Sequence, residues 1–162
     1  MKKIFSYLVV LLILISAGFS QTESAAVAQV NNRQNDVSAT QYAQRVLVLV
    51  NYERHKANLP ALTLSTDLTQ ATMVRANEIT KRFAHTRPNG QSCFTVIKNK
   101  GRILGENIAA GQRSPEEVVI AWMNSKGHRE NILNPKFKEM GLGYLLRPSL
   151  KYKHYWAQFF RG

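Results

Sequence analysis

The sequence has only one cysteine among its 162 residues, so no disulfide bond can form within the chain. Acidic residues are also few, with 10 Asp and Glu against 22 Lys and Arg. The resulting formal net charge of +12 favours anionic partners, such as an envelope polymer, a lipid headgroup surface or nucleic acid. This charge balance bears on the choice of partner and says nothing about the fold.

The chain lacks both the length for a second full domain and the composition of a disordered protein. Its length is typical of one domain, and 44% of its residues are apolar, which is ordinary for a globular protein. Packing and hydrogen bonding must therefore hold the domain together, because no crosslink within the chain is available.

The first 20 residues have the composition of a secretory signal peptide. Two lysines follow Met1, the run from Leu8 to Ile15 is uninterruptedly apolar, and small residues come next. The apolar run is too short to span a bilayer comfortably, and an uncleaved N-terminal anchor is the alternative interpretation. Cleavage is expected after Ser20, or as late as Ala28. The mature protein, without a membrane span, is therefore expected to be secreted and to lie outside the cell or in the cell envelope.

Export and motif content both argue against nucleic acid as the partner. The sequence has no zinc-finger spacing, no aromatic Gly-rich RNA-binding signature and no helix-turn-helix pattern. Removing residues 1–20 takes away two lysines and no acid, so the net charge of +12 becomes +10. An exported protein with this positive charge is expected to bind an anionic polymer or a lipid of the envelope.

The mature chain is expected to begin with a flexible segment and to continue as a helix. Residues 21–40 are rich in Ala, Gln, Asn, Ser and Thr, which predicts a flexible lead-in. A helix is predicted from Gln41 to Asn58, with Thr40 as its N-cap. The apolar run 46–50 would also suit a buried strand, but its long polar flanks favour a helix that is buried on several sides.

A second helix is predicted from Ser65, as N-cap, to about Lys81. The residues at helical spacing on its buried side are Leu68, Ala71, Thr72, Arg75, Ala76 and Ile79. The sequence Pro88-Asn89-Gly90 then suits a tight turn, and Ser92 is expected to cap a short helix after it.

The second half of the chain contains one strong helix start. Residues 102–110 are expected to be loop or strand. Ser114 at the N-cap and Glu117 three residues later form a capping box, with a proline between them at the first helical position. That helix is expected to reach about Ser125 and to be broken by Gly127.

The end of the chain predicts an antiparallel hairpin. Residues 140–146 and 152–160 are rich in aromatic side chains and flank a turn at Arg147-Pro148-Ser149-Leu150. Helices followed by a hairpin indicate an α+β domain.

Two of the four histidines occur where a site can form. His85 and His128 each lie beside a turn, and Glu106 lies about midway between them. Two imidazoles and one carboxylate can bind a divalent metal such as zinc, or perform general acid–base chemistry without a metal. The same spacing suits three residues that only satisfy loop or cap hydrogen bonds. Cys93 is expected to be a buried, inert thiol, with a third soft ligand as the alternative.

Basic residues flank both histidines in the sequence, namely Lys81, Arg82, Arg87, Lys126 and Arg129. If these side chains surround the site, their charge disfavours protonation of the imidazoles and concentrates anionic ligands. The alternative is that they are separate, solvated side chains.

Several groups of residues also occur in the order of one known family. They are Asn51-x-x-Arg54, Leu59-Pro60-x-Leu62, Arg75-Ala76, Phe83-x-His85-x-Arg87-Pro88-Asn89-Gly90, Gly105-Glu106-Asn107-Ile108-Ala109, Ala121-Trp122-Met123-Asn124-Ser125-x-Gly127-His128-Arg129-x-Asn131-Ile132-Leu133 and, in the last strands, Met140-Gly141-Leu142-Gly143-Tyr144 and Tyr155-Trp156-Ala157-Gln158-Phe159-Phe160. This order resembles the CAP superfamily of cysteine-rich secretory proteins, antigen 5 and pathogenesis-related 1 proteins, in its bacterial SCP-domain form. The resemblance covers about residues 42–162 and places the domain at 41–162.

The resemblance implies an α-β-α sandwich, a small antiparallel sheet flanked by helices, with a cleft in which His85 and His128 meet the acid Glu106. The second acid of eukaryotic members falls here on Ser125, or on Asn124 if the alignment is shifted by one residue. A cleft of His85, Glu106, Ser125 and His128 therefore has one carboxylate, which counts against a mechanism that needs two. The disulfides of many eukaryotic members are also missing.

Members of this superfamily have been linked to lipid or sterol binding, signalling, defence and occasionally proteolysis. The sequence favours a non-enzymatic module that binds an anionic or lipidic ligand at the cell envelope and requires no cofactor, although His85 and His128 could also bind a divalent metal such as zinc. The alternative is a metal-dependent hydrolase in which these histidines are ligands and Glu106 is the general base. A purely structural envelope protein is a third interpretation. The missing second acid and the lack of a nucleophile motif favour binding.

Overall fold

The computed structural model describes residues 21–162, so the predicted signal peptide at residues 1–20 lies outside the described residues. Residues up to Gln34 belong to a unit of their own, and Asn35–Gly162 form the compact domain described below. None of the helices in the described part of the chain is both long enough and apolar enough to cross a bilayer.

Helix α1 spans Gln21–Lys56. It begins 20 residues before the predicted start at Gln41, so Thr40 lies inside the helix and is not its N-cap. Ala, Gln and Glu have favourable helix propensities, which accounts for helix in a segment with few large apolar groups. A flexible lead-in and a domain boundary near residue 41 stay predictions.

The apolar run 46–50 is helical, as its long polar flanks predicted. The helix buries one face, however, formed by Ala43, Val46, Val50 and Arg54, with Leu47 and Leu49 partly buried beside it. Val48, on another side, is 57% exposed, so the expectation of burial on several sides was wrong. The fully buried residues recur at spacings of three and four, as expected for a helix that packs one face against a sheet.

After α1, helices and strands are interspersed along the chain and end in two consecutive strands. They are β1 (Thr63–Leu64), α2 (Thr66–Lys81), the 3₁₀ helix η1 (Cys93–Val96), β2 (Leu104–Ala110), α3 (Pro115–Asn124), α4 (Lys126–Ile132), β3 (Glu139–Leu146) and β4 (His154–Arg161). The predicted α+β class and the C-terminal hairpin are confirmed. Residues 102–110, for which loop and strand were both open, contain β2.

Besides Thr40, three helix caps were predicted, and all three serines lie at the N-cap position, although only two of them make the side-chain bond. The Ser92 hydroxyl accepts from the N–H of Phe94, and the Ser114 hydroxyl accepts from the N–H of Glu117. Ser65 is the residue before α2, but its hydroxyl makes no cap bond and contacts the carboxylate of Asp67 instead. The buried residues of α2 are the six that helical spacing predicted.

Gly127 does not end the helical region, contrary to the prediction. α3 ends at Asn124, Ser125 forms the junction, and α4 begins at once with Gly127 in its first turn. A helix of seven residues is too short to show an amphipathic period in the sequence. The consequence for the site is that His128 lies inside a helix and not in a loop.

The four strands form one sheet in the order β1-β3-β4-β2. β3 and β4, and β2 and β4, pair antiparallel, whereas the two residues of β1 pair parallel with β3. The sheet is therefore mixed at one edge, where a fully antiparallel sheet was expected. β2 forms the opposite edge.

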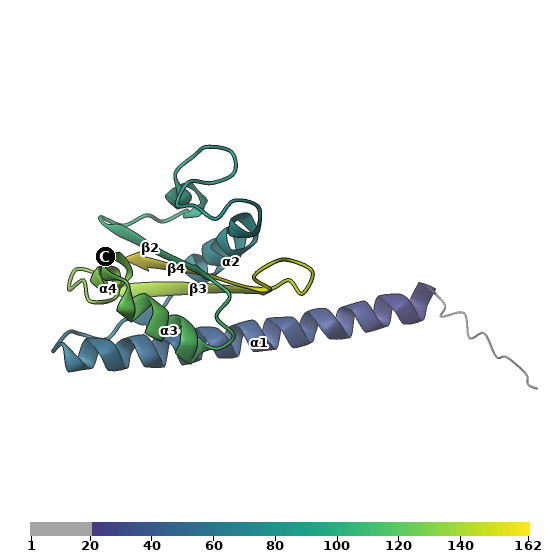
Figure 1. Ribbon diagram of the computed structural model, residues 1–162, viewed down its shortest axis with the longest axis horizontal. Helices are drawn as coiled ribbons and strands as arrows, with labels where there is room; N and C mark the ends of the chain where they lie inside the picture. Colours follow the sequence, from purple (N-terminus) through teal and green to yellow (C-terminus); the bar gives the residue numbers. More distant parts are fainter. Residues whose placement is uncertain (1–20) are drawn as a thin grey trace, which may run out of the picture. The chain divides into compact units, whose positions relative to one another are not determined.

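Helices cover both faces of the sheet, which gives the three layers of an α-β-α sandwich (Figure 1). One face packs against α1, α3 and α4 through a core that includes Val46, Trp122 and Trp156. The other face packs against α2, with Leu68 and Phe159 in contact there. Side chains alternate between the two faces along each strand, so neighbouring residues of β2 meet different helices.

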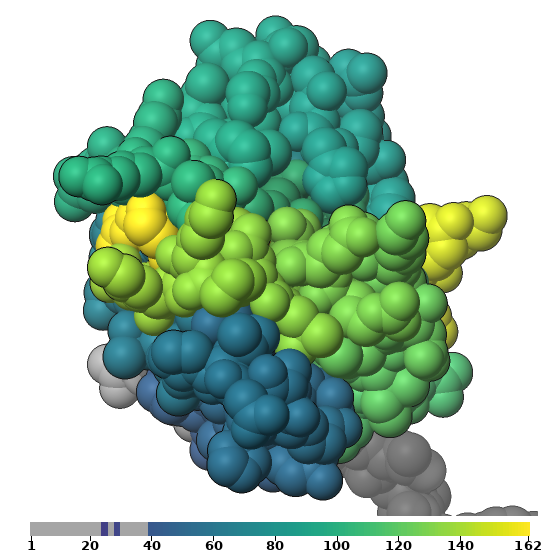
Figure 2. Space-filling model, turned by 90° about the vertical axis from the view of Figure 1, so that its left-hand side faces the viewer, coloured from purple at the N-terminus to yellow at the C-terminus, as the bar shows by residue number. Residues whose placement is uncertain are grey.

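A fully buried arginine fixes the end of α1 against the turn before β3. The Arg54 guanidinium donates to the carbonyls of Pro60, Ile132 and Asn134 at 2.8–2.9 Å. Figure 2 looks onto this end of the domain, where the end of α1 (blue) lies against the segment that leads into β3 (yellow-green). These bonds use the carbonyls that a helix end and a turn leave without partners.

We expect a reducing agent to leave the melting temperature unchanged. The single thiol is buried, and the pKa of Cys93 is raised to about 12, mainly by burial. No crosslink therefore constrains the unfolded chain. Thermal melts with and without dithiothreitol test this, and a drop in the monomer's melting temperature would show that the thiol pairs with another molecule.

Candidate functional site

Glu106 is a carboxylate fixed on the edge strand β2. It lies opposite Phe159 of β4 and faces α2, and its side chain is only 2% exposed. A buried carboxylate needs charged or hydrogen-bonding partners, because burial alone disfavours the ionised form strongly. Both carboxylate oxygens of Glu106 have such partners.

The first partner is Arg75 of α2, whose side chain is fully buried. Its Nε donates to Oε1 of Glu106 at 2.7 Å, and its other nitrogens donate to Glu78 at 2.8 Å and to the carbonyl of Ala84 at 2.9 Å. Arg87 donates to the same Glu78 carboxylate at 2.6 Å. One guanidinium thus holds the end of α2, the segment after it and β2 in a fixed arrangement.

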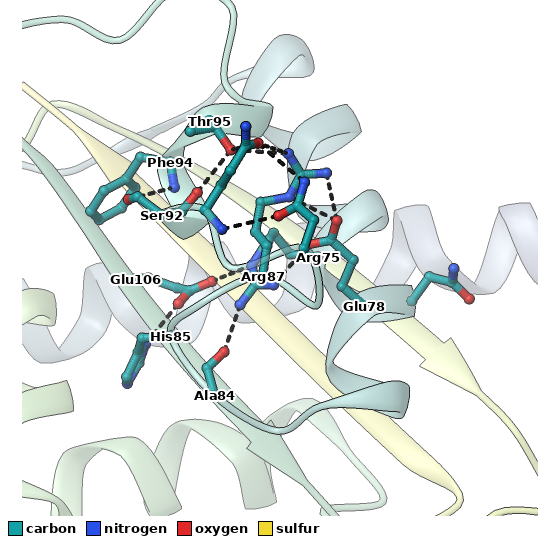
Figure 3. A network of polar contacts seen from close by, with 12 residues as sticks. Arg75, Glu78, Ala84, His85, Arg87, Ser92, Phe94, Thr95 and Glu106 are labelled. Atoms are coloured by element: carbon teal, nitrogen blue, oxygen red, sulfur yellow. Dashed lines mark hydrogen bonds and ion pairs between the residues drawn. The ribbon is translucent and has the colours of Figure 1, made fainter.

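The second partner of Glu106 is His85. The imidazole Nδ1 lies 2.7 Å from Oε2 of Glu106, and the remaining ring atoms point away from the arginines (Figure 3). The hydrogen bond to Glu106 raises the pKa of His85 above its ordinary value of 6.5, although burial and the charge of Arg75 oppose this shift. The side chain is 60% exposed, so its Nε2 edge is available to a ligand.

His128 lies in α4 and is half-buried. Its pKa is lowered from 6.5 by burial and, to a smaller extent, by the charge of His85. The pKa values of the two predicted histidines therefore shift in opposite directions, that of His85 toward the imidazolium and that of His128 toward the neutral ring.

The expected cause of neutral imidazoles was therefore wrong for His85. Flanking Lys and Arg were expected to disfavour protonation, but the contact with Glu106 outweighs the opposing charge of Arg75. For His128 the direction is as expected, while the cause is burial and the other histidine. A carboxylate at hydrogen-bond distance outweighs more distant cations because Coulomb energy falls with separation.

A cluster of amides attaches α4 to β2 beside Glu106. Asn107, fully buried, donates to the backbone carbonyl of His128 at 3.2 Å and to Gln158 at 3.1 Å. Asn131 of α4 donates to the carbonyl of Glu106 at 3.1 Å and to the side chain of Asn107 at 2.9 Å. Glu106 and Asn107 thus fix the two histidine segments from opposite faces of one strand.

The remaining predicted site residues lie at the margin. Ser125 is the half-buried junction between α3 and α4, one turn before His128, and its hydroxyl makes no cap bond. Cys93 is buried in the core with Leu68 and Phe159, and burial raises the pKa of its thiol to about 12, which disfavours the thiolate that binds metals. Among residues 21–162, no group of three or more His, Cys, Asp and Glu side chains could hold a metal ion.

Sequence reasoning missed the roles of Arg75 and Asn107. Arg75 was recognised as one of six residues on the buried side of α2 and as part of the family motif Arg75-Ala76, but no partner was predicted for it. A charged residue in that position signals a buried partner, because an unpaired guanidinium is too costly to bury. Asn107 carried a similar signal, since an amide in a predicted strand must also find hydrogen-bond partners when buried.

Comparisons with known proteins agree with this architecture. The model of the CAP family, described as the cysteine-rich secretory protein family, matches residues 47–160. The protein YkwD of Bacillus subtilis (strain 168) is 40% identical over 130 residues, which are 77% of this chain and 49% of that protein. The chain thus spans about half the length of this relative.

Two solved structures from other bacteria have similar folds. An extracellular protein containing an SCP domain from Bacillus anthracis is 26% identical with a TM-score of 0.65, over 76% of this chain and 41% of that one. An outer surface protein of Borrelia burgdorferi is 22% identical with a TM-score of 0.63, over 70% of this chain and 86% of that one. At 22% identity, the similarity to the Borrelia burgdorferi protein shows a common fold and nothing more.

Proposed function

The chain belongs to the CAP family of cysteine-rich secretory proteins, and from this premise we propose that it is a secreted module that binds an anionic or lipidic ligand at the cell envelope. The Bacillus anthracis relative is described as extracellular, which supports this location. The proposed binding site contains His85, Glu106 and His128, with Ser125 at its margin. The excess of basic residues over acidic ones favours a negatively charged ligand.

The observation that carries the proposal is that His85 is accessible to a ligand whereas Glu106 is not. Glu106 is buried with both oxygens engaged, while the His85 ring is exposed beyond it. Two guanidiniums balance the two carboxylates of Glu78 and Glu106, so protonation of His85 gives this cluster a net positive charge. An exposed imidazolium N–H held in place from behind suits an anionic oxygen.

The same contacts argue against the hydrolase alternative. A general base must reach a water molecule or substrate with a free oxygen. The Arg75 guanidinium and the His85 imidazole take the two oxygens of Glu106 at 2.7 Å each. Glu106 is therefore better suited to orient His85 than to accept a proton from water.

A catalytic zinc site also fits these residues poorly. Catalytic zinc is held by three protein ligands, whereas the predicted donors here are two imidazole nitrogens. The raised pKa of His85 adds a proton that must be displaced before a metal can bind. We expect zinc to bind at most weakly, and less as the pH falls and the imidazoles protonate, His85 before His128.

The test is a titration of the purified protein with monomeric dihexanoylphosphatidylglycerol, an anionic lipid, followed by NMR. His85 is charged below its raised pKa and loses its charge as the pH rises through that value. Binding should therefore weaken from pH 5.5 to pH 8. His85→Gln should lower the affinity at pH 5.5 by about tenfold, as expected for the loss of one charge-assisted hydrogen bond.

His55→Gln is the matched control, because His55 is exposed at the end of α1 and should not affect the affinity. The zwitterionic dihexanoylphosphatidylcholine should bind more weakly than the anionic lipid. Equal affinities for the two lipids, or equal effects of the two histidine variants, would contradict the proposal.

A further inference from the structure

Four large apolar side chains are exposed where the β3–β4 hairpin meets the end of α2. Phe83 is 53% exposed, and Leu146, Leu150 and Tyr152 of the hairpin are 36–45% exposed. Phe83, Leu150 and Tyr152 line one shallow hollow, so segments far apart in the sequence form one surface. Residues 81–83 and 146–153 are called the hairpin patch below.

The hairpin patch is also strongly basic. It contains Lys81, Arg82, Arg147, Lys151 and Lys153, all exposed, and no acidic residue. None of these five takes part in an ion pair among residues 21–162. The patch thus combines uncompensated positive charge with exposed aromatic and aliphatic groups.

A defined turn presents the exposed side chains of the hairpin. The N–H of Leu150 donates to the carbonyl of Arg147 at 3.0 Å, and the N–H of Lys153 donates to Leu150 at 3.1 Å. All eight residues from 146 to 153 are exposed, and the connection extends past the ends of β3 and β4 (Figure 1). A turn closed by its own backbone bonds presents its side chains at little further entropic cost.

The combination of exposed apolar and basic side chains in the hairpin patch favours a bilayer over an anionic polymer as the partner. Single exposed apolar residues are common, but three that line one hollow among cations mark an interaction surface. An anionic bilayer offers phosphates for the cations and an apolar region just beneath them for Phe83 and the hairpin. A sugar–phosphate polymer offers the charges without an apolar region.

We propose that the hairpin patch docks the protein on the surface of an anionic lipid bilayer, with Phe83, Leu150 and Tyr152 entering the headgroup region. This inference rests on the proposed function only in that both place the protein at envelope lipid. The hairpin patch does not include His85, Glu106 or His128. Docking and ligand binding can therefore fail separately.

The test is co-sedimentation of the purified protein with vesicles of phosphatidylcholine alone or with 30% phosphatidylglycerol. Binding to the anionic vesicles is expected, with little binding to the neutral ones. The double variant Phe83→Ser, Leu150→Ser keeps every charge and should lower the affinity for anionic vesicles at least tenfold. Its control is Val74→Ser, Ile120→Ser, which removes two exposed apolar groups elsewhere, 47% and 60% exposed, and should have no effect.

A second pair of variants separates local charge from net charge. Lys151→Gln, Lys153→Gln should weaken binding to anionic vesicles about tenfold or more. Lys98→Gln, Lys100→Gln removes the same charge from another exposed loop and should weaken it much less. Equal losses in the two pairs would overturn the inference, since net charge alone would then explain the binding.

Two further outcomes decide between a bilayer and a polymer, and between docking and ligand binding. If the Phe83 and Leu150 variant binds anionic vesicles normally while soluble polyphosphate displaces the protein, the patch is a polymer site and the inference is wrong. At pH 8, where His85 is least charged, His85→Gln should not affect vesicle binding. If His85→Gln weakened vesicle binding at pH 8 as much as the hairpin variants do, the inference would also be overturned.

Discussion

Arg75→Met is expected to lower the free energy of unfolding by about 3–5 kcal/mol, a typical cost of removing one partner of a buried ion pair. The Arg75 side chain is fully buried, and that of Glu106 is 2% exposed. Methionine fills much of the same volume but leaves the Glu106 carboxylate without its guanidinium. Denaturation in guanidinium chloride, monitored by circular dichroism, measures the change.

Arg45→Met is the matched control. Arg45 and Glu116 form a pair with the same 2.7 Å separation, but their side chains are 52% and 46% exposed. Exposed pairs contribute roughly 0–1 kcal/mol, so this variant should change stability little. If Arg75→Met cost no more than Arg45→Met, the pair between α2 and β2 would not be the structural support of the site.

Gly143→Ala is expected to destabilise the domain by about 3 kcal/mol, at the upper end of the usual range for overpacking. A Cβ atom on Gly143 would overlap the carbonyl group of Thr72, because α2 lies directly on β3 there. The same contact recurs at Gly141, where a Cβ would overlap the backbone of Leu68 one turn earlier. Backbone atoms cannot rotate aside, so α2 and its Arg75 must shift as a unit.

The control for this variant is another glycine-to-alanine change. Gly127 lies in α4, and the space that an alanine methyl group would occupy there has no neighbouring atom within 4 Å. Gly127→Ala should therefore be neutral or stabilise by up to about 1 kcal/mol, since alanine favours the helix. Thermal melts compare the two variants, and an unchanged melting temperature for Gly143→Ala would contradict the close packing of α2 on β3.

Local signals in the sequence were enough for α2, α3 and the hairpin. The six buried residues of α2 follow from helical spacing, and the caps at Ser92 and Ser114 follow from side chains that bond to the next turn. The helical spacing and the caps depend on residues two to four apart. The two-residue strand β1 and the short helix α4 carry too little sequence to show a period, and their positions depend on contacts with distant strands.

The site residues were also predicted from the sequence, whereas their charge states depend on contacts between distant segments. Motif order indicated His85, Glu106 and His128 through the family resemblance. The charge of each imidazole could not be predicted, because it depends on which neighbour lies at hydrogen-bond distance in the fold. Glu106 contacts His85 from 21 residues away, whereas the basic residues next to His85 in sequence do not set its pKa.

The most direct test of the role assigned to Glu106 is an NMR titration of the histidine ring protons in the wild type and in Glu106→Gln. In the wild type, the pKa of His85 should lie above 6.5 and that of His128 below it. In Glu106→Gln the pKa of His85 should fall, because the carboxylate is lost while the charge of Arg75 remains. A wild-type His85 that titrates at or below 6.5, or a pKa that Glu106→Gln leaves unchanged, would contradict the view that Glu106 orients and charges His85.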